Sequence, residues 1–218
     1  MQPIEGILFE PVGCLAEFPA EPFHEISHRL FGGRKQASKS GSRTYWHLLN
    51  LMEARGRELN ASERELTESL EVQAADTASL YDDVVPALTE LRAMGTKLLV
   101  ASSLSNAAIT HFLQRSVPDE LFTDVWDRDT SAGIKTGPLK RALDHASLRP
   151  DRTLFLTDTA EGINTAKSVG VQSILMMNDP DEAKRLAALD PAGGIVSFFE
   201  LPDFVRLLLA RSSGRTPC

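Results

Sequence analysis

Residues 6–15 of this chain read GILFEPVGCL. The first four are apolar or glycine, and a short run of this kind is typical of a strand that is buried on both faces. Glu10 follows this strand at once, and Pro11 and Gly13 then end it. Because an open α/β sheet binds its ligands at the carboxyl ends of its strands, we expect Glu10 to lie at a ligand site.

Further apolar runs at 97–101, 153–157 and 171–176 alternate with segments of helical spacing. Alternation of strands and helices at these lengths is typical of a mostly parallel sheet. The sequence therefore predicts an α/β fold, a Rossmann-like, doubly wound parallel sheet.

Residues 17–79 differ from the rest, because they carry helical periodicity, few β-branched residues and many charges. Tyr45, Leu48, Leu49 and Met52 follow helical spacing and predict the core of a helical unit. We therefore predict a Rossmann-like core of residues 1–16 and 80–210, an inserted helical cap of residues 17–79, and a tail of residues 211–218.

Composition limits the function classes. The chain has 218 residues, with 23 Lys and Arg against 30 Asp and Glu, so its formal charge is −7. That balance argues against binding to nucleic acid or anionic membranes, and no apolar run is long enough to span a bilayer. Cys14 and Cys218 lack metal-ligand spacing, and no secretion signal is visible at the N-terminus. We expect a cytoplasmic protein.

Polar side chains follow three of the expected strands, and one lysine precedes a helix. They are Glu10, Ser102, Asp158 and Lys135. Two carboxylates can hold a hard cation, and a hydroxyl beside an ammonium can hold an anion. These residue types therefore suit a phosphate group beside Mg²⁺.

The order and spacing of these residues resemble the haloacid dehalogenase-like superfamily, in particular its phosphatases with a helical cap inserted after the first motif. The four motifs of that family match residues 9–15, 100–103, 133–138 and 157–162. The resemblance covers residues 4 to about 208. It implies hydrolysis of small phosphorylated metabolites with Mg²⁺.

The resemblance also implies roles for single residues. Glu10 and Lys135 take catalytic positions, and Lys135 binds phosphate together with Ser102 and Ser103. The Mg²⁺ ligands are the Glu10 carboxylate, the backbone carbonyl of Val12 and the Asp158 carboxylate.

Three positions depart from the family pattern. The nucleophilic Asp is Glu10, whose extra methylene shifts its oxygens by roughly 1 Å, a displacement that can cost about 100-fold in rate. The Asp that serves as general acid–base is Val12, and losing such a group costs about 10²–10⁴-fold. The second acid of the fourth motif is Gly162, for which Glu161 is a possible replacement. A longer Glu10 also predicts weak or lost Mg²⁺ binding.

We therefore favour a catalytically impaired relative that binds a small phosphorylated ligand or a protein partner, a second copy of the chain included. One alternative is an active Mg²⁺-dependent phosphatase acting on small phosphorylated metabolites or acyl phosphates. Another is a haloacid dehalogenase-type hydrolase, since family dehalogenases also lack the second Asp and need no metal. A third is a pure interaction module.

Overall fold

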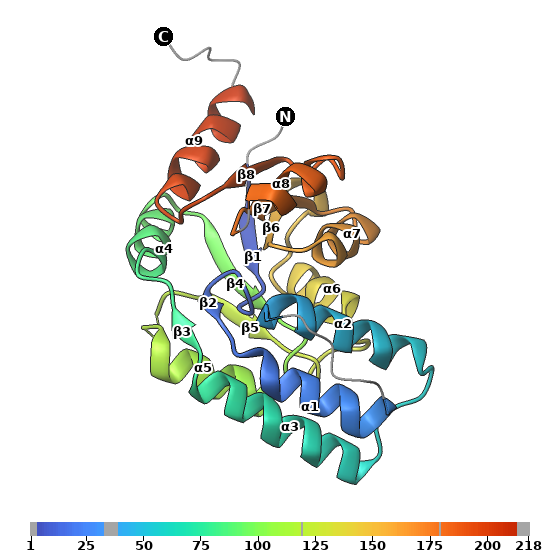
Figure 1. Ribbon diagram of the computed structural model, residues 1–218. Helices are drawn as coiled ribbons and strands as arrows, with labels where there is room; N and C mark the ends of the chain where they lie inside the picture. Colours follow the sequence, from blue (N-terminus) through green and yellow to red (C-terminus); the bar gives the residue numbers. More distant parts are fainter. Residues whose placement is uncertain (1–3, 33–38, 119, 179, 213–218) are drawn as a thin grey trace.

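The computed structural model describes residues 4–32, 39–118, 120–178 and 180–212 (Figure 1). Its strands are β1 Gly6–Phe9, β2 Ala16–Glu17, β3 Ser79–Leu80, β4 Lys97–Ala101, β5 Asp124–Trp126, β6 Thr153–Thr157, β7 Gln172–Met176 and β8 Gly193–Ile195. Its α-helices are α1 Ala20–Phe31, α2 Gly41–Ala54, α3 Ala61–Asp76, α4 Val84–Ala93, α5 Asn106–Ser116, α6 Thr136–His145, α7 Ala160–Ser168, α8 Pro180–Ala187 and α9 Glu200–Ser212, and a short 3-10 helix spans Pro150–Arg152.

Six strands form one parallel sheet in the order β5-β4-β1-β6-β7-β8. This confirms the predicted α/β fold class. Phe9, the last residue of β1, pairs with Val100 of β4 on one side and with Leu156 of β6 on the other. The register therefore brings the residues that follow β1, β4 and β6 to one edge of the sheet.

Strand β1 is covered on both faces because its side chains alternate between two hydrophobic clusters. Ile7 and Phe9 belong to a cluster that includes residues of α4, α5 and α9. Leu8 points into a second cluster with residues of α6 and α7. All four residues of β1 are buried, as the apolar run predicted. Because β1 is a buried central strand, it fixes the position of the Glu10 backbone.

Three helices, α1 to α3, lie between β2 and β3. Helix α1 packs against α2 and α3, and α3 also packs against α5 of the core (Figure 1). Strands β2 and β3 form a two-stranded antiparallel sheet in which Ala16 pairs with Leu80. Sequence reasoning missed this pair, which joins the two chain segments that lead into and out of the helices.

The predicted core residues of α2 are each at most 3% exposed; they are Tyr45, Leu48, Leu49 and Met52. At the start of α3, Asn60 and Glu63 form a capping box that satisfies backbone N–H groups at the helix end. The division into core, cap and tail stays a prediction. Helix α9 continues to Ser212, and residues 213–218 of the predicted tail lie outside the described residues.

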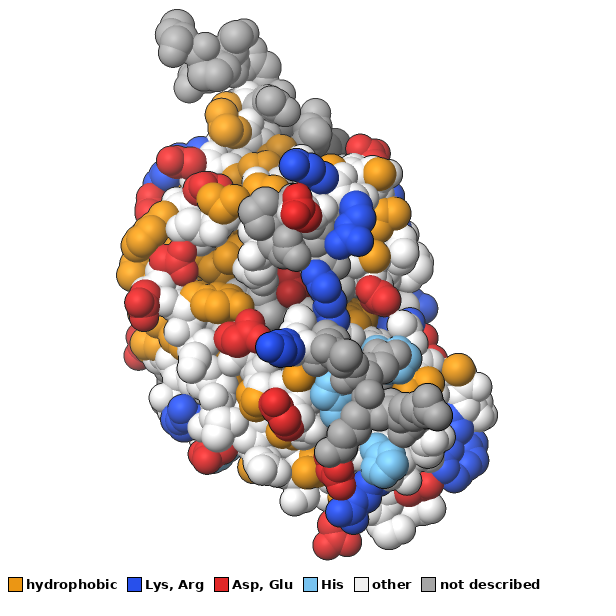
Figure 2. All heavy atoms as spheres, in the orientation of Figure 1, with side chains coloured by type: hydrophobic (Ala, Val, Ile, Leu, Met, Phe, Trp, Pro, Cys, Tyr) orange, Lys and Arg blue, Asp and Glu red, His pale blue; other side chains and the backbone are white. Residues whose placement is uncertain are grey.

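Of the helices that the structure describes, none combines the length and the apolarity needed to cross a bilayer. Figure 2 shows acidic and basic side chains interspersed over the face that it presents.

Candidate functional site

Glu10 leaves the end of β1 and is almost completely buried, with 1% of its surface exposed. The Ser102 hydroxyl donates to its Oε1 atom at 2.8 Å, and the Ser103 N–H faces its Oε2 atom at 3.3 Å. The Tyr45 hydroxyl of α2 approaches the same Oε2 atom at 3.4 Å. The structure therefore brings Glu10, Ser102 and Ser103 together, and the Tyr45 side chain of α2 completes their cluster.

The environment of Glu10 favours the neutral carboxyl group. Burial raises its pKa, against hydrogen bonds from Ser102, Ser103 and the Val12 backbone that lower it, and the result is a pKa of about 8. At neutral pH a carboxyl group with this pKa is mostly protonated and is a weak nucleophile.

Asp158 follows β6 at the same sheet edge, yet its partners differ from those of Glu10. The Ser42 hydroxyl at the start of α2 donates to its Oδ1 atom at 2.7 Å. The Asn178 amide lies 3.5 Å from its Oδ2 atom and donates to the Gly13 carbonyl at 2.8 Å. Gly13 has a φ of +81°, and a Cβ atom there would stand 2.5 Å from both Asp158 Oδ2 and Ser42 Cβ. Only glycine fits this turn, because the two side chains close on it from both sides.

Lys135 precedes α6 and points toward α2. Its ammonium donates to Asn50 Oδ1 at 2.8 Å and pairs with Glu53 Oε2 at 2.8 Å. Both of its partners within the described chain are therefore side chains of α2. The Lys135 side chain is 18% exposed and that of Glu53 is 39% exposed, so this ion pair meets solvent.

Each predicted phosphate-binding donor already has an acceptor within the protein. The Ser102 hydroxyl donates to Glu10, and the Ser103 hydroxyl donates to the Ile134 carbonyl at 2.6 Å. The Lys135 ammonium is engaged by α2.

The remaining departures from the motifs have packing reasons. Val12 is completely buried within the hydrophobic cluster that also contains Phe9. A Cβ atom on Gly162 would stand 1.8 Å from the Thr157 hydroxyl, so this position takes no side chain as the protein is folded. Glu161 lies in the first turn of α7, where its negative charge interacts favourably with the helix dipole.

The carboxylates do not fit Mg²⁺ as they are arranged. The oxygens of Glu10 and Asp158 face hydroxyl and N–H donors, which a cation would have to displace. Among the residues that the structure describes, no group of three or more His, Cys, Asp or Glu side chains is placed to hold a metal ion. Mg²⁺ prefers several oxygen ligands in near-octahedral geometry, which the described side chains do not offer in this arrangement.

A buried ion pair close to the site was missed by sequence reasoning. Glu71 of α3 is fully buried and receives two hydrogen bonds from the Arg128 guanidinium, at 2.8 and 3.0 Å. The Ser105 N–H donates to Glu71 at 2.9 Å, and Arg128 also donates to the Ser103 carbonyl at 2.8 Å. Burial lowers the pKa of Arg128, but Glu71 and other neighbouring groups raise it above its ordinary value, so the guanidinium stays charged.

Two signals in the sequence point to the contacts that were missed. Tyr45 is the polar member of an otherwise apolar stripe, and a buried tyrosine hydroxyl usually has a partner. Glu71 lies four residues after Thr67 and before Ala75, on the buried side of α3. A charged residue on the apolar side of a helix indicates an ion partner elsewhere in the fold.

A large cavity of about 930 Å³ opens beside the site, between the α2–α3 region and the loop before α6. Glu53, Arg128 and Ile134 are among the residues that line it. The cavity thus reaches both the ion pair of Lys135 and the buried pair of Arg128.

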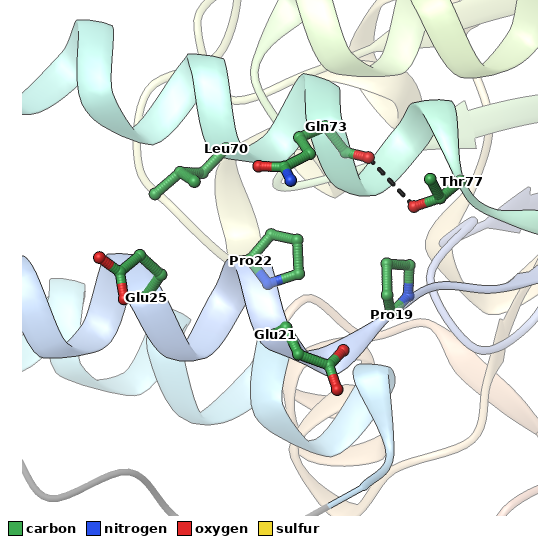
Figure 3. A pocket seen from close by; sticks show the side chains of 7 residues that line it. All are labelled: Pro19, Glu21, Pro22, Glu25, Leu70, Gln73 and Thr77. Carbon is green, nitrogen blue, oxygen red and sulfur yellow. Dashed lines mark hydrogen bonds between the residues drawn. The ribbon is translucent and has the colours of Figure 1, made fainter.

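A smaller pocket of about 320 Å³ lies between α1 and α3 (Figure 3). Its lining contains none of the predicted site residues and consists of Pro19, Glu21, Pro22, Glu25, Leu70, Gln73 and Thr77. It is a separate feature of the helical layer.

Comparison with known proteins gives one family. The family model described as haloacid dehalogenase-like hydrolase matches residues 43–176. Curated relatives of this chain include enolase-phosphatases E1. That of Frankia alni is 32% identical over 130 residues, covering 57% of this chain and 53% of the relative, and that of Klebsiella pneumoniae is 32% identical over 111 residues, covering 49% and 48%. The matches thus span about half the length of these relatives.

Solved structures share the fold over nearly the whole chain. A haloacid dehalogenase-like hydrolase from Bacteroides fragilis has a TM-score of 0.69 at 20% identity, covering 91% of this chain and 99% of that one. CbbY from Rhodobacter sphaeroides, solved with phosphate, has a TM-score of 0.66 at 21% identity, covering 91% and 96%. L-2-haloacid dehalogenase from Xanthobacter autotrophicus has a TM-score of 0.62 at 17% identity, covering 93% and 98%. At these identities the likeness concerns the fold.

Proposed function

We propose a function for this chain, which belongs to the haloacid dehalogenase-like hydrolase family. It is a member impaired in hydrolysis, and it binds a small phosphorylated ligand beside Lys135. The observation that carries the proposal is the state of Glu10. The carboxyl group at the nucleophile position is buried, and it accepts hydrogen bonds from the two residues expected to hold phosphate.

Poor turnover follows from two features of the first motif. A nucleophile must reach the phosphorus atom in line, but both oxygens of Glu10 face donors of the protein. The position of the general acid–base is Val12, whose side chain has no ionisable group and is packed among apolar side chains. An unassisted alkoxide leaving group makes the reaction slower by about 10²–10⁴-fold.

Ligand binding is supported by the partly exposed ion pair at the cavity. Glu53 is the most exposed member of the Lys135 cluster, and an exposed ion pair contributes about 0–1 kcal/mol. An anionic group that enters the cavity can therefore replace the Glu53 carboxylate on Lys135 at a small cost. We propose a phosphate monoester as this group, and weak or lost Mg²⁺ binding at Glu10 and Asp158.

Turnover and binding are tested separately. The wild-type protein is incubated with acetyl phosphate and with a chromogenic aryl phosphate in the presence of Mg²⁺. We expect rates at the level of the uncatalysed reaction. Hydrolysis by the wild type that disappears in Glu10→Ala would show that Glu10 is a working nucleophile, and the proposal would be wrong.

Binding is measured by calorimetry with inorganic phosphate and with a phosphate monoester. Lys135→Met should weaken binding by at least about tenfold, which corresponds to about 1.4 kcal/mol. Lys140→Met is the matched control, because Lys140 is an exposed lysine on α6 and its change removes the same charge. Equal losses in the two variants, or no binding by the wild type, would contradict the proposed ligand and favour a protein partner.

A further inference from the structure

We infer that the carboxyl group of Glu10 occupies an anion-binding cradle of this chain, formed by the Ser102 hydroxyl, the Ser103 N–H and the Tyr45 hydroxyl, and so acts as a built-in inhibitor that keeps small oxyanions out. The inference rests on the proposed function in one respect, that Ser102 and Ser103 are the anion-binding groups of the site. It adds that the cradle is intact and already filled.

The three donors converge on one carboxyl group from different parts of the chain. Ser102 and Ser103 follow β4, whereas Tyr45 lies on α2. Their donor–acceptor distances to Glu10 are 2.8, 3.3 and 3.4 Å, so the hydroxyl of Ser102 makes the shortest contact and the other two are long. Donors that surround two oxygens in this way suit an oxyanion or a carboxylic acid.

The length of the side chain explains why Glu10 reaches this cradle. Residue 10 leaves the sheet between β4 and β6, because Phe9 pairs with Val100 and Leu156. An aspartate at residue 10 is shorter by one methylene, so its carboxylate would withdraw from Ser102 and leave the donors to a second anion. The extra methylene of glutamate fills that space with the chain's own carboxyl group.

Burial makes the contact hard to replace from solution. Glu10, Ser102 and Ser103 are exposed by 1%, 0% and 2%, and Tyr45 by 0%. Leaving a buried hydroxyl or N–H without an acceptor costs free energy, so these donors need an acceptor in the folded protein. While Glu10 provides it within the same chain, a free anion must compete against a group at very high effective concentration.

The experiment removes the internal group and offers it back as a small molecule. Glu10→Ala deletes a CH₂–COOH fragment, which has the size of acetic acid. Thermal unfolding of Glu10→Ala is followed with increasing acetate, and with inorganic phosphate, at ionic strength kept constant with chloride. We expect Tm to rise by about 3–6 °C when the anion is at ten times its Kd. The wild type and Glu10→Gln should not respond to acetate, because their cradles stay filled, and phosphate should raise Tm by more in Glu10→Ala than in the wild type.

A second change in the same background assigns the binding to the cradle. Adding Ser102→Ala to Glu10→Ala removes the closest donor and should abolish the rise in Tm with acetate. If Glu10→Ala does not fold without an anion, the refolded fraction is measured against acetate concentration, and it should increase. The inference is overturned if the Tm of Glu10→Ala shows no dependence on acetate beyond that on chloride, or if Ser102→Ala leaves that dependence intact.

The result is separable from that of the proposed function. If the wild type does not hydrolyse the phosphates and Glu10→Ala responds to acetate, both the loss of turnover and the filled cradle are supported. If the wild type does not hydrolyse the phosphates and Glu10→Ala does not respond to acetate, only the filled cradle is overturned. Hydrolysis by the wild type that needs Glu10, together with an anion response in Glu10→Ala, overturns only the loss of turnover.

Discussion

Helices α2 and α3 meet the core through different chemistry. Helix α2 uses hydroxyl, amide and carboxylate groups that contact Asp158, Glu10 and Lys135, the residues that the motifs single out. Helix α3 uses a buried ion pair, in which Glu71 is fully buried and Arg128 is largely buried. The ion pair of Lys135 on α2 is partly exposed instead.

The two helices therefore have different roles: the α3 contact stabilises the fold, and the α2 contacts affect the site. Glu71 and Arg128 bind each other and the backbone of Ser105 and Ser103, away from the motif residues, so breaking this buried pair should affect stability. The partners of α2 are the groups that a ligand would use. We therefore expect changes on α3 to act mainly on folding, and changes on α2 to act mainly on binding.

The largest effect is expected from breaking the ion pair of α3. Arg128→Met leaves the Glu71 carboxylate buried without its partner and should lower the free energy of unfolding by about 3–5 kcal/mol. Urea denaturation measures this loss. The double variant Glu71→Met with Arg128→Met should recover much of it, because no buried charge remains. Equal losses in the single and double variants would show that packing, and not the charge pair, holds α3.

Arg206 provides a matched control for that result. Its guanidinium pairs with Glu90 and Asp203 at the protein surface. Arg206→Met removes the same kind of pair where solvent screens it, and the loss should be far smaller than for Arg128→Met.

The next effect is a pH dependence that belongs to Glu10. Its pKa is about 8 in the folded protein and near the ordinary value of 4.5 when unfolded, so the folded state binds more protons between these values. Stability is therefore greatest at low pH within this window and falls as pH rises. The loss from pH 5.5 to 7.5, measured by urea denaturation with a chelator present, should be about 2–3 kcal/mol.

Glu10→Gln does not titrate, so its stability should change less over the same pH range. If the wild type and Glu10→Gln follow parallel curves, the carboxyl group is not held neutral by burial.

A smaller loss is expected where α2 begins. Ser42→Ala removes the hydroxyl that donates to Asp158 at 2.7 Å and should cost about 1–2 kcal/mol, because water can replace part of this charge-assisted bond. Ser62→Ala is a suitable control, since Ser62 lies on the exposed start of α3 and its hydroxyl bonds to Asn60. Calorimetric unfolding should separate the two variants, and similar Tm values for both would argue against a specific clamp on Asp158.

The smallest effect on stability, and an opposite effect on binding, is expected for Glu53→Gln. The exposed pair with Lys135 contributes at most about 1 kcal/mol. Its removal leaves the ammonium with the neutral Asn50 amide and no carboxylate partner, so phosphate should bind several-fold more tightly. Glu58→Gln, which changes another carboxylate of the same cavity, is the control. Unchanged affinity in Glu53→Gln would mean that Glu53 does not compete with the ligand.

The sheet and the place of the site could be predicted from the sequence because both depend on local patterns. A buried strand followed by Glu10, and others followed by Ser102 and Asp158, define one edge of a parallel sheet once the strands are identified. The predicted strands at 97–101 and 153–157 have the bounds found in the structure.

The contacts that control the site could not be predicted, since they depend on how helices far apart in sequence pack. Tyr45 and Glu10 are 35 residues apart, and Ser42 and Asp158 are 116 residues apart. Lys135 was expected to face phosphate, but the pattern around it contains nothing that indicates its pairing with Glu53. Helical spacing showed that Tyr45 is buried, yet not what its hydroxyl meets.

The most direct test of the central claim restores the family's first motif. Glu10→Asp together with Val12→Asp is assayed beside the wild type for Mg²⁺-dependent hydrolysis of acetyl phosphate, after circular dichroism has shown that both are folded. We expect the wild type to be silent and the double variant to hydrolyse the substrate at least about 100-fold above it. A wild type that hydrolyses acetyl phosphate as fast as the double variant, and loses this activity in Glu10→Ala, would contradict the account.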